Sequence, residues 1–274
     1  MDPISTTALA AMAGSKALKV FEDVIYRHIY GVSKEELEAQ NKEKAKDIIA
    51  VKEATRDFIV KSEVIKIQRE YKNFGKTLNL ATPYVISEEN KIREDDDFFW
   101  NILEHSKDIS NDEMQILIAK IIAGEYNNPG TYSMSTLQVL KSIDGKLLNN
   151  FTKILGVSLI RTGIFKDIFS SVKDMEQLDA SYTSFLDLQN IGLICSNESS
   201  IRSEEDVFDV YIDKLVYFTA KDKANKEIVV PDFYSLTRAG KEIAQHLNPK
   251  ENSNFIDWLR NKYENRNFNI EVKK

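Results

Sequence analysis

The side chains that most often do chemistry are few in this sequence and far apart. Its three histidines are His28, His105 and His246, and none has a second histidine or a cysteine three or four residues away. Cys195 is the single cysteine. Zinc sites need several such ligands at short, regular spacings, so the sequence predicts no metal site and no intramolecular disulfide.

The motifs of nucleotide and acyl chemistry are also missing. No Gly-x-x-x-x-Gly-Lys, Gly-x-Gly-x-x-Gly or Gly-x-Ser-x-Gly occurs, which argues against phosphate-binding loops, dinucleotide folds and the usual hydrolase nucleophile. Cys195 follows an apolar run and reads as an inert structural thiol. The sequence therefore predicts a protein that is not an enzyme and needs no cofactor. A nuclease built on dispersed carboxylates is the remaining enzymatic alternative.

Two acidic groups have structural explanations. Residues 94–97 (Glu-Asp-Asp-Asp) precede an apolar run, where carboxylates cap a helix and interact favourably with its dipole. Glu125 lies at the end of another apolar helix, before the turn Asn-Asn-Pro-Gly. We expect it to tie this loop to the helix end, with catalysis as the less favoured role. The loop motif consists of Gly124, Glu125, Pro129 and Gly130.

Composition is that of a folded protein with an uneven charge. The chain has 274 residues, 42% of them hydrophobic and 29% charged, and a net charge of −6. No apolar stretch is long enough to span a membrane, and no basic leader is present, which favours a cytoplasmic protein. Residues 171–213 carry 2 basic and 10 acidic side chains (2 − 10 = −8), whereas residues 214–274 carry 12 and 8 (12 − 8 = +4). The surface is expected to change character between these segments.

The elements that position these residues begin with two N-terminal helices. Residues 15–30 form one, and Ser33 with Glu36 forms a capping box that opens a second, which the pattern extends without interruption to about residue 78. Such a helix would be about 60 Å long, and its narrow apolar stripe needs a partner helix. We expect self-association through this stripe. The residues predicted to form it lie on two lines along the helix, Ile48, Phe58 and Ile65 on one and Val64, Ile67, Tyr71 and Phe74 on the other.

The C-terminal part resembles a winged helix. A helix over about residues 175–189 ends at Gly192 and leads into a short strand, strands at 214–219 and 228–230 form the wing, and Thr237 caps the next helix. The helix in the recognition position carries acids and no lysine or arginine, so it would repel phosphates. We therefore favour protein contacts over DNA. The residues that a DNA-binding alternative would use are Lys221, Lys223, Lys226, Arg238 and Lys241.

The middle of the chain resembles a bacterial family, the domain of unknown function 2806. The likeness rests on residues 108–115 (Asp-Ile-Ser-Asn-Asp-Glu-Met-Gln), 119–125 (Ala-Lys-Ile-Ile-Ala-Gly-Glu) and 129–137 (Pro-Gly-Thr-Tyr-Ser-Met-Ser-Thr-Leu). It departs from the family at Ile118, where tryptophan is usual. The resemblance carries no activity, but its layout is similar to that of bacterial abortive-infection proteins and so implies phage defence.

These observations predict a mainly α protein. Its parts would be long helices in residues 1–80, a helical hairpin module in 81–160, a winged-helix-like α+β module in 161–249 and a C-terminal helix and tail in 250–274. The expected function is non-enzymatic: a homo-oligomer that binds a protein partner. A winged-helix transcription regulator is one alternative. A membrane-acting effector, with residues 4–30 lying on a bilayer, is another.

Overall fold

A computed structural model of the chain describes most of it and divides it into two units. The described residues are 33, 36–40, 42, 54–86, 92, 95–222, 227–263 and 266–273, with the backbone alone for 54–60. The units comprise Met1–Leu137 and Gln138–Lys274, and each is considered by itself. The finer division at residues 80, 160 and 249 stays a prediction.

The described part of the first unit consists of helices joined by turns and short loops. Asp96 caps α5 by accepting from the backbone N–H of Phe99, and Asn111 caps α6 by accepting from that of Met114. Within the acidic run, Asp96 thus caps α5, as the sequence indicates. The helices are α4 (Ala54–Ala81), α5 (Asp97–Ser106), α6 (Asp112–Asn127) and α7 (Met134–Ser142), with a 3-10 turn η1 (Thr82–Tyr84) between the first two.

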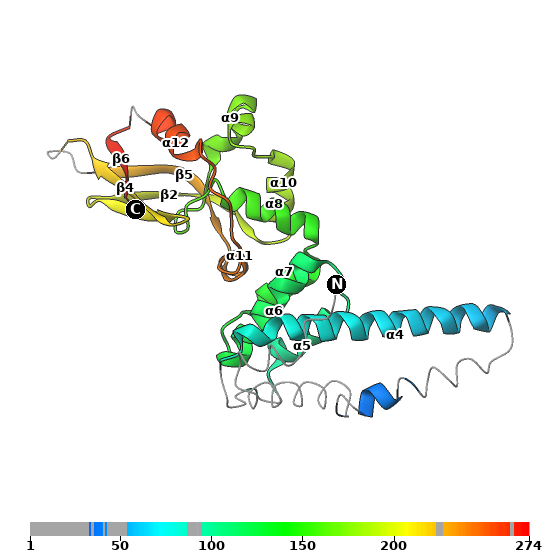
Figure 1. The fold of residues 1–274 in the computed structure, drawn as a ribbon. Helices are drawn as coiled ribbons and strands as arrows, with labels where there is room; N and C mark the ends of the chain where they lie inside the picture. Colours follow the sequence, from blue (N-terminus) through cyan, green and yellow to red (C-terminus); the bar gives the residue numbers. More distant parts are fainter. Residues whose placement is uncertain are drawn as a thin grey trace. The chain divides into compact units, whose positions relative to one another are not determined.

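The described residues contradict the uninterrupted helix that the sequence predicts from residue 33 to 78. The capping box is present, since Ser33 N–H donates to Glu36 Oε2 at 2.8 Å and Glu36 N–H donates to Ser33 Oγ at 3.4 Å. However, the Tyr71 hydroxyl donates to Glu38 Oε1 at 3.0 Å. In one straight helix these residues would lie about 50 Å apart. The helical segment 36–40 therefore lies beside α4 (Figure 1).

The C-terminal half of α4 is held in the core of the first unit. Phe74, Leu78 and Ala81 are buried. The buried Asn73 amide donates to the Lys107 carbonyl at 2.9 Å, so α4 is tied to the residues just after α5. The N-terminal half of α4 extends beyond α5 and α6 (Figure 1).

The second unit mixes helices and strands. Its helices are α8 (Gly145–Leu155), α9 (Val172–Gln177), α10 (Tyr182–Asn190), α11 (Arg238–Ala244) and α12 (Phe255–Tyr263), with a 3-10 turn η2 (Lys166–Phe169). Its strands are β1 (Ile164–Phe165), β2 (Ile194–Ser203), β3 (Val207–Tyr211), β4 (Lys214–Ala220), β5 (Ile228–Leu236) and β6 (Phe268–Lys273).

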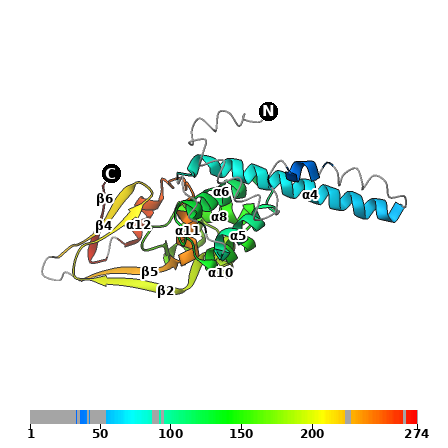
Figure 2. The same ribbon diagram turned by 90° about the horizontal axis from the view of Figure 1, so that it is seen from below.

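The described strands form two antiparallel three-stranded sheets, in the orders β1-β5-β2 and β3-β4-β6. Figure 2 shows β2 and β5 side by side in one layer and β4 and β6 in the other. The predicted mainly α class is therefore wrong, and the protein is α+β. Most of β2 is polar and exposed, so it lacks the apolar alternation that marks a half-buried strand. Strand β6 (Phe-Asn-Ile-Glu-Val-Lys) does alternate, but it is a short run in a segment predicted from the sequence to be a tail.

The predicted wing and recognition helix are also corrected. Strands β4 and β5 exist, but β4 pairs with β3 and β6, whereas β5 pairs with β1 and β2, so the two do not form one hairpin. The helix predicted over 175–189 is broken. Asp179 adopts a positive φ of 49° between α9 and α10, and Ser181 starts a new helix by accepting from Ser184 N–H at 3.3 Å.

The end of α10 is locked to the start of α11. Gly192 has a φ of 84°, and the Thr237 hydroxyl donates to its carbonyl at 2.6 Å while accepting from Gly240 N–H at 2.9 Å. A side chain at Gly240 would collide with the Leu193 carbonyl. This close approach explains why the Leu-Thr-x-x-Gly step carries threonine and glycine at these positions.

Candidate functional site

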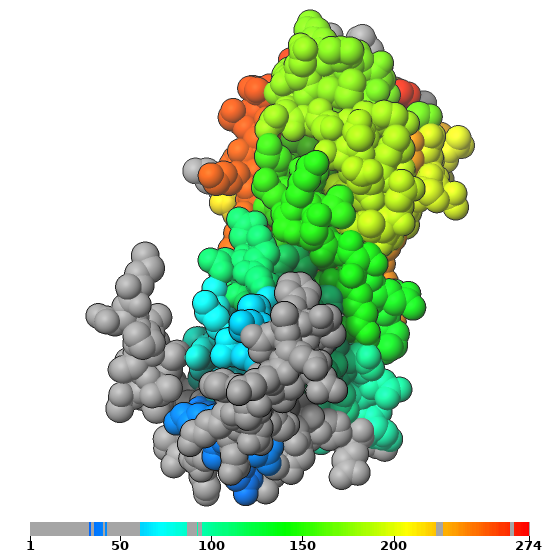
Figure 3. Space-filling model, turned by 90° about the vertical axis from the view of Figure 1, so that its right-hand side faces the viewer, coloured from blue at the N-terminus to red at the C-terminus, as the bar shows by residue number. Residues whose placement is uncertain are grey.

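A groove of about 620 Å³ opens on the second unit between α8, α9 and α10. Its lining includes Ile154 from α8, Val172 and Glu176 from α9, and Asp179 and Tyr182 around the start of α10. Val172 is 66% exposed and Tyr182 is 51% exposed. Two large apolar side chains thus stand at an open groove on this unit. Figure 3 shows the face to which these helices, coloured green to yellow-green, contribute.

Two serine caps set the angle between the helices of the groove. The Ser171 hydroxyl accepts from Asp174 N–H at 3.1 Å, which starts α9, and Ser181 starts α10. Asp179 lies in the connection and pairs with Lys153 of α8, with 3.5 Å between Oδ2 and Nζ. The break between α9 and α10 therefore turns acidic groups toward α8.

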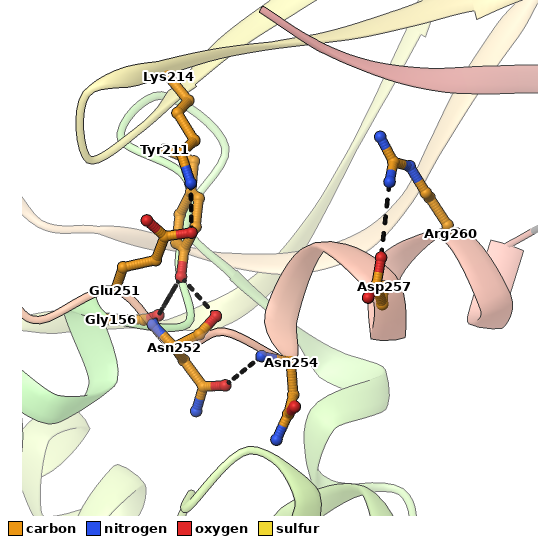
Figure 4. Close-up of polar contacts among 8 residues, drawn as sticks. All are labelled: Gly156, Tyr211, Lys214, Glu251, Asn252, Asn254, Asp257 and Arg260. Carbon is orange, nitrogen blue, oxygen red and sulfur yellow. Dashed lines mark hydrogen bonds and ion pairs between the residues drawn. The ribbon is translucent and has the colours of Figure 1, made fainter. Parts of the chain in front are cut away.

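The segment before α12 is hydrogen-bonded to the connection between α9 and α10. The Asn252 and Asn254 amides donate to the carbonyls of Leu178 and Gln177 at 2.9 and 3.0 Å. Asn252 N–H in turn donates to the buried Tyr211 hydroxyl at 2.9 Å, and that hydroxyl lies 2.9 Å from the Gly156 carbonyl (Figure 4). Strand β3, the end of α8 and the segment before α12 thus meet at one hydroxyl. Its burial raises the pKa of Tyr211 to about 12.

A second anchor lies on α9 itself. Asp174 accepts from Trp258 Nε1 at 2.8 Å, from Lys262 Nζ at 2.9 Å and from the Ser171 hydroxyl at 2.7 Å. Burial alone would raise the pKa of Asp174, but the hydrogen bonds from Lys262, Trp258 and Ser171 outweigh it and lower the pKa. Helix α12 therefore fixes α9 through a charged carboxylate.

The groove suits an apolar side chain flanked by positive charge. The Tyr182 ring is stacked near that of Phe185, with 6.2 Å between centroids, so it is held in place. Glu176 and Asp179 supply negative charge, and the only lysine in the lining, Lys153, is paired with Asp179. Neither Val172 nor Tyr182 was singled out from the sequence. The Ser-x-x-Asp and Ser-x-x-Ser spacings at residues 171 and 181 are the signals that could have revealed both helix starts.

The predicted self-association stripe is divided by the structure. Phe74 is buried in the first unit and Tyr71 is half-buried, whereas Ile65 and Ile67 are 65% and 40% exposed and Val64 is half-exposed. Ile65 and Ile67 lie about 200° apart around the helix, on the two separate lines that the sequence predicts. Ile48 lies outside the described residues, as does the side chain of Phe58.

The loop motif is assembled as a structural clamp. Glu125 is buried and accepts from the backbone N–H groups of Gly130 and Tyr132, the latter at 3.0 Å. Burial raises its pKa, the loop hydrogen bonds act in the opposite direction, and the charge of Asp96 adds to the increase. Gly130 has a φ of 84°, and Pro129 precedes it in the turn.

Gly124 makes room for the same loop. A side chain there would collide with the Tyr132 hydroxyl. The Tyr132 ring stacks on Phe98, with 5.7 Å between centroids, so it cannot readily move aside. The segment that carries the family resemblance thus has a packing reason for each of these residues.

The predicted nucleic-acid residues are spread over different elements. Lys221 follows β4, Arg238 and Lys241 lie on α11, and Lys223 and Lys226 lie outside the described residues. Arg238 Nε donates to Glu242 at 2.7 Å, so its charge is partly neutralised.

The membrane and metal predictions can be followed only in part. In the described part of the chain, no helix is long and apolar enough to cross a membrane. Residues 4–30, proposed for an interfacial helix, lie outside it. Among the described residues, no three histidine, cysteine or acidic side chains gather as metal ligands would.

Comparisons with known proteins give one match. No curated protein and no solved structure matches the chain. The family model described as "Protein of unknown function (DUF2806)" matches residues 60–260. This match spans helices α5 to α11, both sheets up to β5, and most of α4 and α12. Because it covers well over half of the sequence, the chain belongs to the DUF2806 family.

Proposed function

We propose that this protein is a non-enzymatic interaction protein whose second unit binds a basic, apolar segment of another protein in the groove between α8, α9 and α10. The observation that carries the proposal is the exposure of Val172 and Tyr182 at the rim of that groove. Exposed apolar groups of this size cost free energy in water, and burying them favours binding.

The negative charge of the groove favours a partner segment that carries positive charge. Glu176 and Asp179 line the groove, and residues 171–213 as a whole carry a net charge of −8 (2 − 10). Lysine or arginine flanking an apolar anchor would match this surface, and electrostatic attraction would speed association. An acidic segment or the phosphates of a DNA duplex would be repelled.

The order of elements supports a winged-helix interpretation of the unit. Helix α8, strand β1, helices α9 and α10 and strand β2 follow one another. Strands β3 and β4 come next, and β5 then pairs between β1 and β2. Helix α10 then takes the recognition position. It carries Asp187 and no lysine or arginine, which favours a protein partner over DNA.

The test is a peptide-selection experiment on the full chain. We expect peptides selected from a random library to combine lysine or arginine with leucine or phenylalanine, and to bind with micromolar affinity. Replacing Val172 and Tyr182 by serine should weaken the selected peptides at least about tenfold, because each anchor side chain loses its apolar contact. Glu176→Lys should weaken basic peptides in particular. Fluorescence anisotropy measures each change.

Leu186→Ser is the matched control. Leu186 is also an exposed apolar residue of α10, but it does not line the groove. Its replacement should leave peptide binding unchanged. Selected peptides without basic residues, or peptides that bind the Val172 and Tyr182 variants as well as wild type, would contradict the proposal.

Self-association through α4 is a second candidate. It is favoured by Ile65 and Ile67, which stand exposed on the half of α4 that extends beyond α5 and α6. Analytical ultracentrifugation of the full chain, with these two residues replaced by serine, tests it.

A further inference from the structure

The outer face of the β3-β4-β6 sheet presents aromatic rings to solvent. Opposite residues of paired strands share a face. The register therefore places Phe208 beside Tyr217 and Tyr217 beside Glu271, and it places Lys273 beside Leu215 on the same face. The opposite face is closed, with Tyr211, Val216 and Phe218 buried.

Each of the two aromatic rings has a cation over it. The Phe208 side chain is 48% exposed, and its ring centroid lies 6.2 Å from that of Tyr217. The Arg161 guanidinium lies 5.0 Å from the Phe208 centroid, and Lys273 Nζ lies 4.5 Å from that of Tyr217. Cations attracted to ring faces are held where a ligand would meet both groups at once.

We propose that this face binds single-stranded nucleic acid, with bases stacked on Phe208 and Tyr217 and phosphates contacted by Arg161 and Lys273. Every base has a π face, so the exposed Phe208 ring and the half-buried Tyr217 ring beside it can accept successive bases with little regard to sequence. The cations that cover the rings in the free protein move to the phosphates. A duplex keeps its bases stacked on one another and cannot offer them to the rings.

The pocket beside Phe208 carries charges of both signs. It has a volume of about 260 Å³, and its lining includes Arg161, Asp206 and Asp209. Asp209 is buried and accepts from the backbone N–H groups of Arg161 and Thr162 at 2.8 and 2.6 Å. The Thr162 hydroxyl is enclosed and is not among the proposed contacts.

The charge balance predicts a particular salt dependence. Arg161 and Lys273 face the ligand, but Glu271 lies opposite Tyr217 on the same face. Two phosphate contacts on a single strand give a slope of log K against log salt of about −1.4, which is shallow. Stacking should therefore supply much of the affinity, and binding should persist at moderate salt.

The experiment measures binding of fluorescent oligonucleotides of about 12 residues, oligo(dT) and oligo(rU), to the full chain by anisotropy. Phe208→Leu and Tyr217→Leu should each weaken binding about tenfold or more without changing the salt slope, because they remove stacking alone. Arg161→Gln and Lys273→Gln should each reduce the slope by about 0.7. A preference for one oligonucleotide identifies DNA or RNA as the natural ligand.

Tyr84→Leu is the matched control. Tyr84 is another exposed aromatic residue with a cation nearby, Lys120 Nζ at 6.0 Å from its centroid, but it belongs to the first unit. Binding should be unchanged in this variant, and circular dichroism melts should show that all variants fold. The inference is overturned if neither oligonucleotide binds at low salt. Equal binding by Phe208→Leu and wild type, or tighter binding of a duplex, also overturns it, as does a change in sedimentation mass caused by Phe208→Leu.

Discussion

The indole N–H of Trp258 donates to a carboxylate oxygen of Asp174 at 2.8 Å, although 84 residues separate the two in sequence. The other carboxylate oxygen accepts from Lys262 Nζ. Helix α9, which forms one wall of the groove, is therefore positioned by a helix from the far end of the chain. The position of this groove wall therefore depends on α12 being folded in place.

Replacing Asp174 by asparagine tests this dependence. The amide keeps the shape of the carboxylate but loses its charge, and the ion pair with Lys262 is removed. We expect the free energy of unfolding to fall by about 1–3 kcal/mol. Chemical denaturation followed by tryptophan fluorescence measures the change. Asp179→Asn is the control, because its exposed ion pair with Lys153 at 3.5 Å should contribute less than about 1 kcal/mol.

The same carboxylate predicts a pH dependence. The folded pKa of Asp174 is lowered, so its contribution to stability is present above the unfolded pKa, ordinarily 3.8, and is lost as pH falls through the folded value. The stability difference between wild type and Asp174→Asn should shrink in this acidic range. A difference that stays constant from pH 6 to about pH 3 would contradict the assignment.

The stability contributed by Glu125 should depend on pH in the opposite direction to that contributed by Asp174. Its folded pKa is raised above the ordinary value of 4.5, chiefly because the side chain is buried. The folded protein then holds the proton more tightly than the unfolded chain. The contribution of Glu125 to stability should be full below pH 4.5 and decline as pH rises through the folded pKa. Unfolding free energies of wild type and Glu125→Gln between pH 4 and 7 measure this. The exposed Glu104→Gln variant controls for general pH effects.

Two glycine-to-alanine changes should alter stability in opposite directions. At Gly124 the added methyl group meets the buried Tyr132 side chain, so Gly124→Ala should destabilise the first unit by about 1–3 kcal/mol. At Gly75, in α4, nothing lies within 4 Å of the added carbon. Gly75→Ala should therefore stabilise the helix by about 0.5–1 kcal/mol. Thermal unfolding of the two variants and wild type measures both changes. A melting temperature of Gly75→Ala below that of wild type would contradict the prediction.

Residues of the α4 stripe should separate into two classes. Phe74→Ala should cost about 3–5 kcal/mol of stability, because Phe74 is fully buried within the first unit. Ile65→Ser and Ile67→Ser should change the unfolding free energy by less than about 1 kcal/mol. If α4 mediates self-association, the double serine variant dissociates at higher protein concentration than wild type. Sedimentation velocity that is unchanged in the double variant would remove α4 from any interface.

Sequence reasoning predicts the local signals of this fold better than its pairings. The capping box at Ser33, the cap at Thr237 and the helix end at Gly192 follow from side chains that bond their own backbone neighbours. Such contacts are local, and a residue type alone specifies them.

The strand pairings and the contact between distant helical segments could not be predicted from local residue types. Whether β4 meets β5 or β6 is decided by packing among residues about 50 positions apart, for example Tyr217 opposite Glu271. The return of the chain that brings Glu38 to Tyr71 is likewise set by a distant partner. The groove could not be predicted for the same reason. Val172 and Tyr182 are isolated apolar residues in the sequence, and they are seen to line one groove only when α9 and α10 are recognised as two separate helices.

The position of β6 in its sheet has a consequence for synthesis of the chain on the ribosome. β4 lies between β3 and β6, so the sheet is incomplete until residue 273 has emerged. Phe218 and Phe268, whose ring centroids lie 5.4 Å apart, cannot form their contact before then. The first unit has its described helices in place much earlier, and units of a chain generally fold in order of synthesis. A nascent chain paused before β6 would thus carry a folded first unit and an unpaired edge on β4. An unpaired strand edge can pair with another chain and aggregate unless a chaperone covers it.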